Sequence, residues 1–164
     1  MSLAAPEEMA RSIALKALDR AARSRAQLEQ LLSSRGIPPQ VAAGVLDRFE
    51  AVGLVDDQAL AQALVRARHG ERGLAGRALM EELSRKGIDP ATAAAAVAQV
   101  TPEDEAAAAR RVARQRLRAS AGLPRQTRLR RATAALVRKG HPPGAAYAAV
   151  QRLLAEEADQ AGGL

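Results

Sequence analysis

Leu79-Met80-Glu81-Glu82-Leu83-Ser84-Arg85-Lys86-Gly87-Ile88-Asp89-Pro90 is the segment that decides the fold, because the chain contains its pattern three times. The other copies run from Leu28 to Pro39 and from Ala132 to Pro143. In every copy a leucine lies four residues before a glycine, a basic residue directly precedes the glycine, and a proline follows three residues later. This pattern predicts a helix that ends at a left-handed glycine, with a cation near its last carbonyls, and a new helix that begins at the proline.

The residues between the copies supply the remaining helix ends. Candidate N-caps are Ser24, Asp56, Asp89 and Thr101, and candidate stops are Gly53, Gly70 and Gly122. We therefore predict helices at 7–21, 25–35, 39–52, 57–69, 74–86, 90–100, 102–121, 125–139 and 143–158. These helices form three tandem three-helix repeats, residues 1–52, 53–101 and 102–164, each with a small core, in an elongated and curved arrangement.

The composition agrees with an all-α fold. Alanine, the best helix former, supplies 40 of 164 residues, whereas the chain has one Phe, one Tyr and no Trp, too few for a typical sheet protein. The absence of Cys excludes disulfides and thiolate metal sites. No apolar run approaches the ~20 residues of a membrane span. We expect a cytoplasmic protein with no membrane segment.

Positive charge is concentrated in the third repeat. The net charge is +1 for residues 1–52, zero for 53–101 and +6 for 102–164. Residues 110–139 contain eleven basic residues and no acid, whereas codon bias explains a general preference for Arg over Lys but not this concentration. The eleven are Arg110, Arg111, Arg114, Arg116, Arg118, Arg125, Arg128, Arg130, Arg131, Arg138 and Lys139.

Helical spacing arranges most of these cations in rows opposite apolar residues. Such rows are typical of a surface that binds phosphates or an acidic protein, although an ordinary solvated face is the alternative. The binding candidates are Arg110, Arg111, Arg114, Arg118, Arg125, Arg128, Arg131, Arg138 and Lys139. Because Phe49 and Tyr147 are the only aromatic residues, we expect any nucleic-acid contact to be non-specific, salt-dependent and made to the backbone.

The sequence offers no group for catalysis. His69 and His141 lie in different repeats, and His141 occupies the place of Ile37 and Ile88, which predicts a packed residue rather than a metal ligand. The pair at positions 56 and 57 is interpreted as an N-cap and a first-turn carboxylate rather than a metal site. We expect no metal, no cofactor and no enzymatic activity.

The middle repeat resembles that of the RecX family. The resemblance lies in Gly53-Leu54-Val55-Asp56-Asp57, in Arg68, and in the Glu82-Leu83-x-x-Lys86-Gly87-Ile88 motif. The family usually has aromatic residues near Leu60 and Leu64 and a Phe where His141 stands, so the chain departs from it in packing residues. The resemblance implies a regulator that binds RecA filaments on DNA and inhibits RecA ATPase, strand exchange and coprotease activity, with effects on DNA repair and the SOS response. We expect a monomer whose partners are the RecA filament and single-stranded DNA. Secondary contact candidates are Arg68, Arg72 and Arg77.

Other classes of function remain open at this point. A non-specific DNA-binding helical-repeat protein would bind DNA and act without RecA. A structural adaptor would neither bind DNA nor affect RecA. We hypothesise that replacing Arg110, Arg114, Arg128 and Arg131 with Ala weakens filament binding and its salt dependence.

Overall fold

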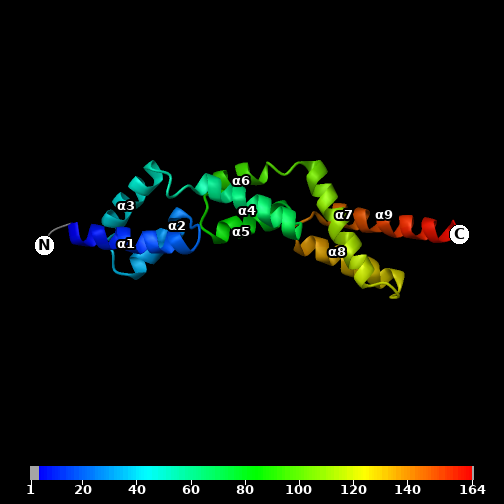
Figure 1. The fold of residues 1–164 in the computed structure, drawn as a ribbon. Coiled ribbons are helices and arrows are strands. Elements are labelled where there is room, and N and C mark those ends of the chain that lie inside the picture. The colour runs from blue at the N-terminus through cyan, green and yellow to red at the C-terminus, as the bar shows by residue number, and fades with distance from the viewer. Residues whose placement is uncertain (1–3, 164) are drawn as a thin grey trace. The chain divides into compact units, whose positions relative to one another are not determined.

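The computed structural model describes residues 4–163, which form nine helices and no strand (Figure 1). The helices are α1 (Ala4–Arg20), α2 (Arg25–Ser34), α3 (Pro39–Ala51), α4 (Asp57–Arg72), α5 (Gly76–Arg85), α6 (Pro90–Val97), α7 (Pro102–Ala119), α8 (Arg125–Arg138) and α9 (Pro143–Gly162). The all-α prediction is confirmed for this part of the chain. The largest difference at a helix end is at α9, which continues to Gly162 instead of ending at 158.

The three motif turns have the predicted conformation. Their glycines, Gly36, Gly87 and Gly140, have φ angles of 79°, 78° and 93°. In each turn the residue after the glycine donates its backbone N–H to the carbonyl of the buried motif leucine, at 3.0 to 3.1 Å. This bond is the defining contact of a Schellman C-cap. The next helix then begins at the motif proline, as predicted.

The predicted N-caps are also present. The side-chain oxygens of the four caps accept the backbone N–H three residues later, at 3.0 to 3.2 Å; the pairs are Ser24 with Gln27, Asp56 with Ala59, Asp89 with Thr92, and Thr101 with Asp104. Asp57 has a second role that the sequence did not indicate, because its Oδ1 accepts the backbone N–H of Arg25 at 2.9 Å. The helix ends are thus fixed by local hydrogen bonds that satisfy otherwise unpaired backbone groups.

The stop predicted at Gly70 is wrong. Helix α4 continues through Gly70 and ends at Arg72, before Gly73, whose φ is 68°. A Cβ at Gly73 would lie 2.7 Å from Val112 Cγ2, so this position also allows a close approach of α7. A glycine inside a helix costs only about 1 kcal/mol relative to alanine, which packing offsets.

The chain divides into two compact units, and each unit takes part of the middle repeat. The first unit joins the chain up to Leu64 with Glu82–Ala96, and the second joins Val65–Glu81 with the chain from Val97 onward. Helices α1–α3 build the core of the first unit, and α7–α9 build that of the second (Figure 1). The predicted division at residues 52 and 101 remains a prediction.

Within the first unit, the motif turn of the second repeat packs on the start of α2. The hydroxyl of Ser24, which is fully buried, donates a hydrogen bond to the carbonyl oxygen of Lys86. A Cβ at Gly87 would lie 2.5 Å from Ala26 Cβ, closer than real side chains approach. The glycine therefore serves both the left-handed turn and the contact with the preceding repeat.

The same contact recurs within the second unit, one repeat later. The backbone N–H of Ala75 donates to the carbonyl oxygen of Lys139 at 2.8 Å, and a Cβ at Gly140 would lie 2.6 Å from both Ala75 O and Ala78 N. Ser24 and Ala75 both lie twelve residues before their own motif glycine. Gly36 lies in the first copy of the motif, and a Cβ added there would meet nothing within 4 Å.

The core side chains explain how so alanine-rich a chain folds. The buried residues are mostly alanines, leucines and valines, and the small alanines allow the helix axes to approach closely. None of the described helices combines the length and the apolar character that a membrane crossing requires.

We expect alanine at two of the motif glycines, Gly36 and Gly140, to have unequal effects on stability. Gly36→Ala should lower the free energy of unfolding by about 1–2 kcal/mol, because only the left-handed φ is penalised. Gly140→Ala should cost about 3 kcal/mol or more, because backbone atoms of the neighbouring turn must also move. Urea denaturation followed by helical circular dichroism measures both values, and equal losses would contradict the close-approach role.

Candidate functional site

The basic segment of the third repeat is displayed by α7 and α8. Helix α7 carries three acidic residues in its first turn and Arg116 and Arg118 in its last, so both ends complement the helix dipole. Helix α8 begins at Arg125 and ends at Arg138. Their apolar faces pack on α9, which leaves most of the arginines at the surface.

Two of the predicted binding residues have acidic partners on α9. Arg110 Nη2 lies 2.7 Å from Glu156 Oε2. Arg128 binds Glu157 through both terminal nitrogens, at 3.0 and 3.1 Å, and donates from Nη2 to the carbonyl of Leu117 at 2.9 Å. The side chain of Arg128 is only 12% exposed, unlike the solvent-facing position that helical spacing predicted. These arginines join the helices of the repeat.

Five other binding candidates are exposed and have no hydrogen-bond or ion-pair partner among residues 4–163. We call this set the unpaired arginines: Arg114, Arg118, Arg125, Arg131 and Arg138. In the first repeat, by contrast, Arg25 at the start of α2 contacts the carboxylates of Glu29, Asp47 and Glu50, which raise its pKa, although Arg20 and Arg35 are exposed there without a partner. The third repeat thus keeps a cationic surface that its own carboxylates leave uncompensated.

The unpaired arginines do not form one continuous row. Arg114 and Arg118 line a groove with Glu156 and Glu157, between the second halves of α7 and α9. Arg138 instead lines a groove between α8 and α9, together with Arg130 and Tyr147. The pattern in sequence correctly predicted exposed cations, but the arrangement around α8 depends on where α9 packs.

The remaining candidates surround the connection between α4 and α5. Lys139 Nζ donates to the carbonyl of Arg72 at 2.7 Å, and Arg111 Nη2 donates to that of Gly70 at 3.4 Å. Burial lowers the pKa of Lys139, and the nearby guanidinium groups of Arg116 and Arg72 lower it further. Lys139 therefore binds the end of the neighbouring helix α4.

Two of the three secondary candidates, Arg68 and Arg77, also have partners. Arg77 bridges Glu81, at 2.8 Å, and the carbonyl of Val137, at 2.9 Å. Arg68 is half-buried on α4 and interacts with its surroundings. Among these three residues, only the side chain of Arg72 is exposed without a partner in the described chain.

Both histidines form hydrogen bonds to the same connection. His141 is 3% exposed, and its Nε2–H donates to the carbonyl of Gly73 at 2.9 Å, while the Nδ1–H of His69 donates to that of Leu74 at 2.9 Å. The prediction that His141 is a packed residue is confirmed. Across residues 4–163 no group of three or more acidic or histidine side chains could hold a metal ion.

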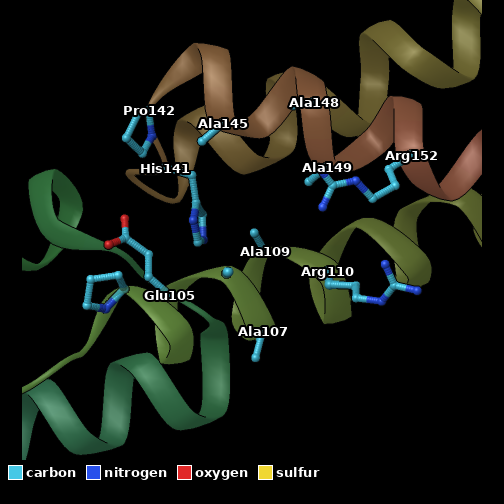
Figure 2. A pocket seen from close by; sticks show the side chains of 12 residues that line it. Glu105, Ala107, Ala109, Arg110, His141, Pro142, Ala145, Ala148, Ala149 and Arg152 are labelled. Carbon is cyan, nitrogen blue, oxygen red and sulfur yellow. The ribbon is translucent and has the colours of Figure 1, made fainter.

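A groove of about 540 Å³ runs between the first halves of α7 and α9 (Figure 2). Alanines form half of its lining, and Figure 2 shows His141 reaching toward α7 between Glu105 at one end and Arg110 and Arg152 at the other. Neither a nucleophile nor a paired acid and base lies in it. The groove contains no arrangement that suggests catalysis.

Comparison with known protein families shows to which family the chain belongs. The model of the first three-helix domain of RecX matches residues 10–49, and the model of its second three-helix domain matches residues 56–97. A regulatory protein RecX from Thermobifida fusca is 47% identical over 162 residues, which cover 97% of this chain and 85% of the relative. The chain belongs to the RecX family.

Other RecX proteins are also similar to the chain in sequence or in fold. The regulatory protein RecX of Mycolicibacterium smegmatis is 39% identical over 158 residues, covering 94% of this chain and 84% of the relative. A crystal structure of RecX from Lactobacillus salivarius has the same fold, with a TM-score of 0.82, 20% identity, and coverage of 92% of this chain and 97% of that one. In this RecX family member the arginine-bearing third repeat lies outside both matched domain ranges.

We expect His141 to make stability depend on pH. Burial, its largest influence, lowers the pKa of His141 below the ordinary value of 6.5, so the unfolded chain takes up a proton that the folded chain does not. The free energy of unfolding should therefore fall as the pH drops from 7.5 to 5.5, by at most about 1.4 kcal/mol per pH unit. His141→Gln keeps an N–H donor without a titrating group and should flatten this dependence; identical slopes for both proteins would contradict it.

Proposed function

We propose that this RecX family member regulates RecA: it binds RecA filaments on single-stranded DNA and inhibits their ATPase, strand-exchange and coprotease activities. It acts as a cytoplasmic monomer and needs no cofactor. Membership of the family supports a regulatory role, because the curated relatives are named regulatory proteins. The resemblance to the family implies that the partner is the RecA filament.

The observation that carries the binding mode is the set of unpaired arginines on α7 and α8. Two of the acidic residues of α9 are already bound to Arg110 and Arg128, so they do not neutralise these five side chains. A filament on DNA is a dense polyanion, and each arginine that contacts a phosphate releases condensed counterions. The arginines thereby supply affinity without reading base sequence.

Inhibition follows from binding rather than from catalysis. Three tandem repeats offer several contact surfaces on one chain, so a single bound molecule can hold neighbouring RecA protomers in one arrangement. A ligand that favours one conformational state of the filament resists a change to another state in proportion to its preference. One chain can therefore affect more than one protomer.

The test combines RecA ATPase and strand-exchange assays with substoichiometric protein. The variant replaces Arg114, Arg118, Arg131 and Arg138 with Ala, and its matched control replaces Arg20, Arg35, Arg66 and Arg85, which are equally exposed and also unpaired within the described chain. Both variants remove four positive charges. Loss of inhibition in the first alone assigns binding to α7 and α8.

We expect the wild-type protein to inhibit RecA well below one chain per protomer. Filament affinity should fall in the α7–α8 variant, and its logarithmic dependence on salt should become shallower by roughly 0.7 per lost phosphate contact, or about 3 in total. No effect of the wild-type protein on RecA would overturn the proposal. Tight binding to naked DNA with RecA unaffected would instead favour a free-standing DNA-binding protein.

A further inference from the structure

A second groove in the third repeat combines an aromatic ring with cations. It has a volume of about 690 Å³ between α8 and the start of α9 and is lined mainly by Leu129, Arg130, Thr133, Val137, Arg138 and Tyr147. We call it the Tyr147 groove. Its volume lies within the range of roughly 300–1,000 Å³ typical of sites for small ligands.

Tyr147 presents an aromatic face at this groove. Tyr147 is 45% exposed, whereas Phe49, the other aromatic residue of the chain, is only 5% exposed. Gln151 Nε2 donates a hydrogen bond to the Tyr147 hydroxyl at 3.0 Å from the next turn of α9. This hydrogen bond favours one position of the ring, and a partly exposed aromatic ring can stack on a planar group.

The polar groups around the ring favour an anionic ligand. Arg130 and Arg138 are exposed and have no hydrogen-bond or ion-pair partner within residues 4–163, and no acidic residue lines the groove. A ligand with negative charge would pair with both arginines.

We infer that the Tyr147 groove binds one nucleotide of single-stranded DNA, with the base stacked on Tyr147 and the phosphate held by Arg130 and Arg138. This site rests on the proposed binding to DNA and adds to it a contact with bases. A nucleotide can use the Tyr147 side chain through its base and both arginines through its phosphate. A glutamate-rich protein segment would use the arginines but leave the aromatic ring without a matching surface.

Stacking also explains sequence tolerance. Every base has a π-face, so a single aromatic platform strengthens binding without selecting a sequence. The inference therefore changes the expectation of backbone-only contact while keeping the expectation of non-specific binding.

The experiment compares a fluorescein-labelled oligodeoxythymidylate with an abasic oligomer of equal length and charge, using fluorescence anisotropy and the full chain. The wild-type protein should bind the thymidylate about tenfold more tightly than the abasic oligomer. Tyr147→Leu should remove this difference, whereas Tyr147→Phe, which retains the ring, should preserve it. Because Tyr147 is the only tyrosine and the chain has no tryptophan, its intrinsic emission should be quenched by the thymidylate.

The outcomes separate this inference from the proposed function. Equal, salt-dependent binding of both oligomers would overturn the nucleotide site and leave backbone binding by the unpaired arginines intact. Binding of neither oligomer would remove the proposed DNA contact as well. If a glutamate-rich peptide bound in a manner that depends on Tyr147 and the oligomers did not, the groove would belong to a protein segment and the inference would be wrong.

Discussion

The carbonyl oxygen that precedes a motif glycine is the acceptor on which the joining of repeats depends. It accepts a hydrogen bond from the preceding repeat, from the hydroxyl of Ser24 in one case and from the backbone N–H of Ala75 in the other. The glycine beside it has no side chain to separate the two backbones. One residue type thus ends a helix, turns the chain and allows the next contact, which explains why the same motif recurs in a chain built largely of small residues.

This arrangement assigns different tasks to similar cations. Lys139 binds the backbone carbonyl of Arg72 at the end of α4, Arg77 binds that of Val137 in α8, and Arg110 and Arg128 bind carboxylates of α9. Their charges are used within the fold. The unpaired arginines remain available to an external polyanion, so the residues that hold the third repeat together are largely separate from those proposed to bind.

Local features of the fold could be predicted from the sequence, because helix caps and left-handed glycines depend on residues within one turn of each other. The capping box at Ser24 and the stop at Gly87 are of this kind. The close approach at Gly73 could not be predicted, because a Cβ there would meet Val112, which is 39 positions away in the sequence.

The candidate site shows the same limit. Exposure of Arg131 and Arg138 followed from helical spacing, since both lie opposite buried leucines. The pairing of Arg128 with Glu157 did not follow from helical spacing. The acid-free segment of the sequence meets acidic residues only after α9 packs against it. The proximity of Tyr147 to Arg130 and Arg138 likewise requires the packing of α8 on α9.

Native-state hydrogen exchange tests the joining of repeats most directly. The Ala75 amide lies in a short connection, yet it donates to the Lys139 carbonyl, and the His141 amide lies in the turn that presents this carbonyl. If the contact joins the two repeats, both amides are exposed in the same opening reaction, and they exchange with the same free energy of opening. An Ala75 amide that exchanges as fast as an unprotected loop, while the His141 amide remains protected, would contradict the account.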